Sequence, residues 1–216
     1  MSTQINLKEI ERKAFRSTYQ DGLWDMYYGL VVMAMSIFVY RPATGYSPTN
    51  IVLAMLAFFV AGLLLFAGKK YITLPRMGQV KFGPMRKQKM TTLGVILGVL
   101  VLLQVALVGL TTQGWLNPEA SAKINDFLAS RDLMDVAVAA IGALIIGVSF
   151  TVMAYFTDFP RGYYIALLSS LAVFLMIYLN QPIYPIIIGT LIILPGLVLF
   201  VRFLRDYPLR TEASDE

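Results

Sequence analysis

The chain of 216 residues contains neither cysteine nor histidine. Without cysteine it can form no disulfide bond and can carry out no thiol redox chemistry. Without histidine it lacks the usual general base near neutral pH, which intramembrane serine and metalloproteases need, and a common ligand for zinc, haem iron and copper. We therefore expect no metal site, no cofactor and no enzymatic activity.

Charged residues are also scarce, at 14% of the chain, whereas hydrophobic residues make up 57%. An ordinary soluble domain has about 25% charged residues. Six apolar runs each approach the roughly 17–25 residues that a helix needs to cross a bilayer. The sequence therefore predicts an all-α integral membrane protein, a single polytopic domain over residues 1–216 with six transmembrane helices at 23–40, 51–68, 91–110, 133–156, 163–179 and 183–203.

Lysine and arginine are distributed unequally between the two sides that six spans would create. Fifteen of the eighteen fall on the side that holds both termini, and three fall on the other side. Because cytoplasmic connections are enriched in these residues, we expect both termini to be cytoplasmic in a multi-pass protein of the cell membrane. Aromatic residues at the ends of the runs, such as Trp24, Tyr40 and Trp115, suit the headgroup level in this topology.

Two amphipathic segments lie outside the apolar runs. Residues 5–20 have apolar positions at helical spacing and a charged opposite face, which predicts a helix lying in the cytoplasmic interface. A second interfacial helix is predicted over 117–131 on the outer side, and residues 206–216 form a cytoplasmic tail. Each half then has an interfacial helix followed by three spans, the plan of an inverted three-plus-three repeat. The alternative is that the halves share only their hydropathy, because few residues match directly.

A Leu-x-Asp motif opens the first run of each half, with its acid at Asp25 in DGLWD and at Asp135 in RDLMD. An aspartate in the first turn of a helix can accept hydrogen bonds from free backbone N–H groups and complements the helix dipole. Both residues are therefore predicted to be helix-start acids. The alternative is that they bind a proton or a cation.

The second connection, residues 69–90, carries seven cations and no acid. Alternating residues on either side of a Pro and Gly predict a small cytoplasmic β-hairpin within it. Each cation near a membrane surface contributes on the order of 1 kcal/mol to the binding of anionic lipid. The candidate lipid or partner surface consists of Lys69, Lys70, Arg76, Lys81, Arg86, Lys87 and Lys89; the alternative is that these residues only fix the topology.

A few polar or helix-breaking residues interrupt the apolar runs. Amides and hydroxyls inside a membrane can line a pathway, although hydroxyls more often bond to their own helix. A proline inside a span frees a backbone carbonyl. The candidate pathway residues are Gln104, Ser149, Thr151, Ser169 and Pro195.

Two functions remain open at this point. The first is a non-enzymatic membrane scaffold or accessory component whose basic cytoplasmic surface contacts anionic lipid or an acidic cytoplasmic partner. The alternative is a small transporter or channel built on the inverted repeat. The scarcity of ionisable residues within the spans favours the scaffold, because coupled transporters normally place charges there. The bilayer itself is the one expected partner in either case, and no nucleic acid is expected.

Overall fold

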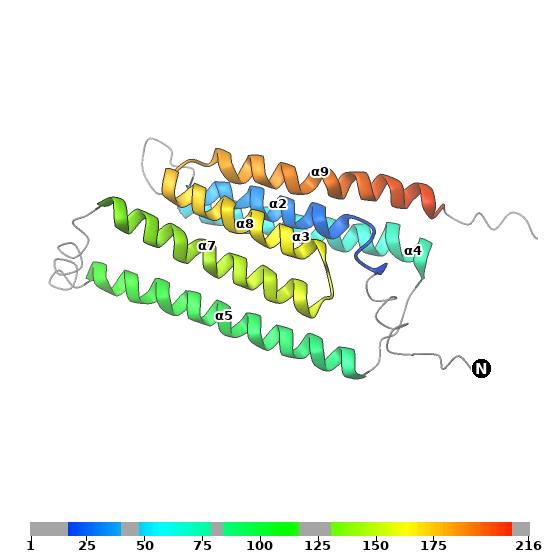
Figure 1. Cartoon of the computed structure of the whole chain (residues 1–216), viewed down its shortest axis with the longest axis horizontal. Coiled ribbons are helices and arrows are strands. Elements are labelled where there is room, and N and C mark those ends of the chain that lie inside the picture. The colour runs from blue at the N-terminus through cyan, green and yellow to red at the C-terminus, as the bar shows by residue number, and fades with distance from the viewer. Residues whose placement is uncertain (1–16, 40–47, 79–83, 117–130, 209–216) are drawn as a thin grey trace, which may run out of the picture.

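The computed structural model describes residues 17–39, 48–78, 84–116 and 131–208, and within these ranges it contains helices and no strand (Figure 1). Each of the six apolar runs forms a helix. Proline begins two of them, at Pro48 and Pro84, where its missing N–H leaves no bond unmade. The helices are α2 (Leu23–Val39), α3 (Pro48–Gly68), α5 (Pro84–Leu116), α7 (Arg131–Phe156), α8 (Arg161–Leu179) and α9 (Ile183–Asp206).

Among the described residues, four helical segments are long and apolar enough to cross a bilayer. They are Val52–Met77, Val136–Phe156, Arg161–Leu179 and Ile183–Asp206. Large apolar side chains cover the outside of the bundle, with Leu167 71% and Leu102 69% exposed. A soluble monomer rarely exposes an apolar surface of this extent. These features are those of an α-helical protein embedded in a membrane.

The helices lie side by side, with α2 and α8 between α9 on one side and α7 on the other (Figure 1). Helix α2 contacts α3, α8 and α9. Helix α3 packs on the outer side of α2, α7 packs on α8, and α5 contacts α7 at the edge of the bundle. The two halves are packed unequally, because α2 makes an extensive interface with α9 whereas its counterpart α7 makes a small one with α5.

Glycines allow the backbones of α2 and α9 to approach closely. A Cβ atom added to Gly29 would lie 2.7 Å from the Gly189 carbonyl oxygen, and one added to Gly189 would lie 2.7 Å from the Gly29 oxygen. Two helical turns away, a Cβ added to Gly22 would collide with the Gly196 carbonyl oxygen and lie 2.9 Å from the Phe200 backbone nitrogen. Gly22 also has a φ of 75°, which a residue with a side chain rarely adopts. Both requirements fix glycine where the chain enters α2.

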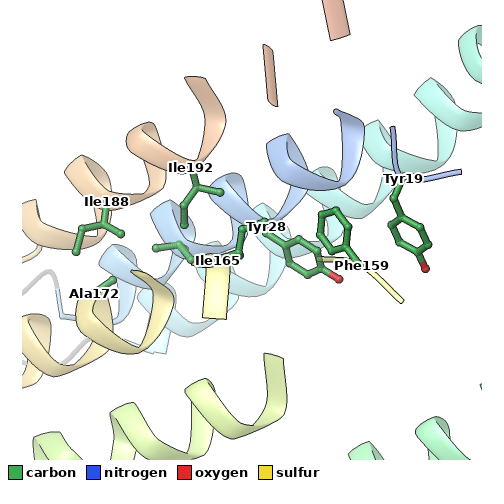
Figure 2. Close-up of a cluster of buried hydrophobic side chains, with 8 residues drawn as sticks. Tyr19, Tyr28, Phe159, Ile165, Ala172, Ile188 and Ile192 are labelled. Atoms are coloured by element: carbon green, nitrogen blue, oxygen red, sulfur yellow. The ribbon is translucent and has the colours of Figure 1, made fainter. Parts of the chain in front are cut away.

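A buried apolar cluster joins α2, α8 and α9 (Figure 2). Ile165 of α8 meets Ile188 and Ile192 of α9 in its centre, and Tyr28 extends it toward the beginning of α2. The ring of Phe159 stacks on Tyr19, with the ring centroids 5.0 Å apart. The cluster fills the space between the three central helices with side chains.

The predicted hairpin in the basic connection is wrong in its first strand. Residues Lys69–Thr73 form a turn of π-helix, η1, and Leu74–Met77 form a short α-helix, α4, so that helix α3 continues without interruption to Met77. Pro75 follows directly on the π-helical turn, in which the Leu74 N–H bonds to the Lys69 carbonyl oxygen five residues earlier, and this local change of hydrogen bonding accommodates a residue without an N–H. The second predicted strand, at 80–82, lies outside the described residues.

Both predicted interfacial helices lie largely outside the described residues. Residues 17–22, which follow most of the first one, form a turn in which the Gln20 N–H bonds to the Ser17 carbonyl oxygen at 3.1 Å. The second, 117–131, is described only at Arg131, the first residue of α7. The tail is described as far as residue 208, and α9 ends at Asp206.

Candidate functional site: a buried charge cluster at one end of the bundle

Two aspartates near the beginning of α2 are completely buried. Asp21 and Asp25 are each 0% exposed, although both carry ionisable carboxyl groups. Gly22, between them, turns the chain into α2, and Asp25 lies in the first turn of that helix. A buried carboxylate is stable only when cations or hydrogen-bond donors surround it, so the partners of each one define the site.

The Asp21 carboxylate binds the π-helical turn that follows α3. Its Oδ2 atom lies 2.6 Å from the Lys69 ammonium and accepts the Thr73 hydroxyl at 2.6 Å. Its Oδ1 atom accepts the Leu23 N–H at 3.2 Å, which caps the start of α2. The ammonium of Lys69 also donates to the Thr18 carbonyl oxygen. Single turns of π-helix are rare and frequently mark functional positions; here the turn brings Lys69 and Thr73 to one carboxylate oxygen.

The Asp25 carboxylate joins α2 to the beginning of α8. Its Oδ2 atom lies 3.1 Å from the Arg161 guanidinium, and its Oδ1 atom accepts the Tyr164 hydroxyl at 3.3 Å. It also accepts its own backbone N–H in the first turn of α2. Arg161 donates in addition to the Tyr19 carbonyl oxygen and lies over the Phe159 ring. Asp25 therefore attaches α2 to α8 and also accepts a hydrogen bond from the backbone at the beginning of α2.

A third ion pair connects α5 to the turn between α7 and α8. The Arg86 guanidinium donates to Asp158 Oδ2 at 2.9 Å, and both side chains are largely buried. Asp158 has a φ of 52°, a left-handed conformation that aspartate adopts more readily than most residues. Through this pair the outermost helix is attached to the central ones at the same end of the bundle (Figure 1).

The three ion pairs together form a clamp at this end of the bundle. Each carboxylate has its own cation, so no two acids share a proton as they do in an aspartyl protease. Among the described residues, no group of three potential metal ligands comes together. Removing one partner of a buried pair typically destabilises a protein by about 3–5 kcal/mol. The cluster can therefore hold the ends of four helices together.

Some cations of the predicted basic surface are paired inside the bundle, and others are exposed. Lys69 and Arg86 are used in the clamp. Lys70, Lys87 and Lys89 are exposed, and Arg76 is half-buried with its guanidinium donating to the Ile72 carbonyl oxygen at 3.1 Å. Lys81 lies outside the described residues. Lys70 and Arg76 belong to η1 and α4, and Lys87 and Lys89 to the first turns of α5. Helix α4 and the beginning of α5 lie at the clamp end of the bundle (Figure 1).

The candidate pathway residues do not gather around one cavity. The Ser149 hydroxyl donates to the Ile145 carbonyl oxygen of its own helix at 2.7 Å. Thr151 and Pro195 are exposed on the outside of α7 and α9. Ser169 is completely buried in α8, and its hydroxyl has no hydrogen-bond partner there. Gln104 lies in α5 and the other helix-start acid, Asp135, lies near the beginning of α7; neither side chain is among those described.

Sequence reasoning identified Asp25 but not the partners of the two buried acids. A usable signal was present: Asp21 precedes and Asp25 begins an apolar helix that contains no cation, so any neutralising charge must come from another segment. The glycines of the α2–α9 interface were also missed. Gly22 and Gly29 are separated by seven residues, as are Gly189 and Gly196, and seven residues are about two helical turns.

Comparison with protein-family models, with curated proteins and with solved structures found no match to this chain. Function must therefore be argued from the molecule itself.

Proposed function

We propose that this chain is a non-enzymatic membrane scaffold or accessory component with six spans, both termini in the cytoplasm of the cell, and a basic cytoplasmic surface that contacts anionic lipid. The three ion pairs support the six-span topology. They bring the beginning of α2, the end of α3, the beginning of α5 and the beginning of α8 to one end of the bundle, which is the alternation that six antiparallel crossings require. The cation-rich side is then the cytoplasmic side.

The observation that carries the scaffold proposal is the closed centre of the bundle. Helices α2 and α9 meet backbone to backbone at Gly29 and Gly189, which leaves no room for water or a solute between them. The space enclosed beside Tyr28, Met153 and Ile165 measures about 10 Å³. This volume is at the lower limit for a single water molecule, so the described helices support no pathway along this part of the centre.

The arrangement of polar groups supports the same proposal. A solute pathway needs polar side chains that face a common space, whereas Ser149, Thr151 and Pro195 are turned toward their own helix or the outside. The two buried carboxylates at the clamp end are each paired with a cation. The inverted repeat is not needed for this function, and the unequal interfaces of the two halves give it no support.

The outward cations supply the working surface. Lys70, Lys87 and Lys89 are exposed at one end, and Lys69 and Arg86, which are paired internally, fix the segments that carry them. Three exposed cations near an anionic membrane surface contribute on the order of 3 kcal/mol together. The clamp therefore presents a rigid positive surface to the headgroups of the cytoplasmic leaflet.

A flux assay separates the scaffold from the transporter. The purified protein is reconstituted in vesicles, and the release of trapped ions and small solutes is compared with that of protein-free vesicles. We expect equal rates. Flux that requires the protein and disappears in Ser169→Ala would instead support the transporter, because Ser169 is the buried candidate with a free hydroxyl.

The lipid contact is tested with spin-labelled phospholipids in the same vesicles. We expect a motionally restricted fraction that is larger for phosphatidylglycerol than for phosphatidylcholine and that decreases at high salt, because salt screens exposed charges. The variant Lys87→Gln/Lys89→Gln should reduce the preference. Arg205→Gln is the matched control, since Arg205 is 82% exposed but lies beside Asp206, 3.8 Å away. Equal restriction of both lipids would contradict the proposal.

A further inference from the structure

A groove of about 380 Å³ lies between α2, α3 and α9 at the clamp end of the bundle. Leu30 of α2 contributes to its floor, Leu64 and Leu65 line the α3 side, and Phe200 lines the α9 side. The lining is almost entirely apolar, and Leu64 is 57% exposed. The groove is therefore open toward the lipid.

The groove has the length of one membrane leaflet. Along α3 and η1 it extends from Ala61 to Ile72. Eleven helical steps of about 1.5 Å give about 17 Å, which is slightly more than half of the roughly 30 Å of bilayer hydrocarbon. Because one end lies beside the clamp, the groove spans the leaflet on the basic side.

Cations lie at the clamp end of the groove. The Lys70 ammonium is 5.4 Å from the centre of the Tyr71 ring, and Tyr71 lines the groove. Lys69 is paired with Asp21, whereas Lys70 is exposed. The guanidinium of Arg76 bonds to the carbonyl of Ile72, another lining residue. The apolar groove thus ends beside cations and an aromatic ring at headgroup level.

We propose that the groove holds one acyl chain of an anionic phospholipid of the cytoplasmic leaflet, with its phosphate bound by Lys70 and Arg76. The proposal rests on the proposed function in that it takes the basic end as cytoplasmic. A single extended chain suits the space, and the cations select a negative headgroup.

Tryptophan quenching by brominated phospholipids tests this occupant in the full-length protein. Trp24→Phe and Trp115→Phe remove the two native tryptophans. Leu64→Trp then reports on the groove. Leu63→Trp is the matched control, because Leu63 is the adjacent residue of α3, is 49% exposed, and does not line the groove. Vesicles contain either brominated phosphatidylglycerol or brominated phosphatidylcholine at equal fractions.

At Leu64→Trp we expect the association constant for phosphatidylglycerol to exceed that for phosphatidylcholine about fivefold, the factor that corresponds to the roughly 1 kcal/mol of one surface cation. At Leu63→Trp the ratio should be close to one. Adding Lys70→Gln to Leu64→Trp should reduce the ratio toward one. Circular dichroism and size-exclusion profiles check that each variant is folded.

Three results would overturn the proposal. The first is the same ratio of association constants at Leu64→Trp and Leu63→Trp, and the second is a ratio that persists in Lys70→Gln. The third is weak quenching by both lipids at Leu64→Trp alone, which would mean that protein covers the groove. The outcome is independent of the spin-label experiment on Lys87 and Lys89. If the ratio at the groove is lost but the spin-label preference for phosphatidylglycerol remains, only the groove proposal is refuted. If the spin-label preference is lost but the ratio at the groove remains, only the proposed lipid contact of Lys87 and Lys89 is refuted.

Discussion

The pair of Asp21 and Lys69 offers a sharp test of the buried clamp. In Lys69→Met the completely buried Asp21 carboxylate keeps the Thr73 hydroxyl and the Leu23 N–H but loses its cation. Removing one partner of a buried pair costs about 3–5 kcal/mol, and the absence of solvent at Asp21 places Lys69→Met at the upper end. Asp21→Asn should lower the free energy of unfolding by about 3 kcal/mol, since Lys69 is 25% exposed and can turn toward water.

The double variant Asp21→Asn/Lys69→Met distinguishes an ion pair from two independent contacts. It removes both charges, so we expect it to be less destabilised than Lys69→Met alone. The measurement is the free energy of unfolding in mixed micelles, followed by circular dichroism. Asp206→Asn is the control, because Asp206 lies 3.5 Å from Arg202 at the exposed end of α9. This substitution should change the free energy of unfolding by less than about 0.5 kcal/mol. Additive effects in the double variant, or a Lys69→Met effect as small as that of the control, would refute the reasoning.

Three further predictions concern other parts of the fold. Gly29→Ala should lower the free energy of unfolding by about 1–3 kcal/mol through overpacking, whereas Gly62→Ala, whose added Cβ meets nothing within 4 Å, should be neutral or stabilising in the same assay. Arg86→Gln should increase hydrogen exchange in the first turns of α5 without changing exchange in α9, because it releases the tie to Asp158; unchanged exchange in α5 would contradict this role. Burial raises the pKa of the Tyr19 phenol from 10.0 to about 12, so the folded state favours the neutral phenol and stability should fall as the pH rises from 10 toward 12; Tyr19→Phe should show a smaller fall over this interval in thermal unfolding.

The positions of the helices could be predicted from the sequence because long apolar segments dominate it. Each predicted run lies within or overlaps a helix, and α8 ends at the predicted residue, Leu179, where Asn180 adopts a left-handed conformation. The α-helical, membrane-embedded class is thus confirmed. The number of spans stays a prediction, because four helices among the described residues are long and apolar enough to cross a bilayer. The side of the termini stays a prediction because it depends on charge bias.

The error in the basic connection has a tertiary cause. Tyr71, Ile72 and Thr73 favour strands by composition, and they alternate with their neighbours over only a few residues. The Asp21 carboxylate lies across from them and binds both Lys69 and Thr73 when the chain stays helical. A contact 52 residues away in the sequence therefore overrides the local preference.

The composition of the site was less predictable than its location. Lys69 and Lys70 are adjacent and chemically identical, yet one is paired inside the bundle and the other is exposed. Arg86 and Lys87 differ in the same way. Which neighbour turns inward depends on helix rotation at the end of a span, and the charge pattern alone does not record it.

The clamp also has a consequence for how the protein is made. Asp25 leaves the ribosome long before its partners, since Tyr164 follows it by 139 residues. At about 5–20 residues per second, the delay is roughly 7–28 s. During that interval Asp25 lacks both Arg161 and Tyr164, so the attachment of α2 to α8 can form only after α8 has been synthesised.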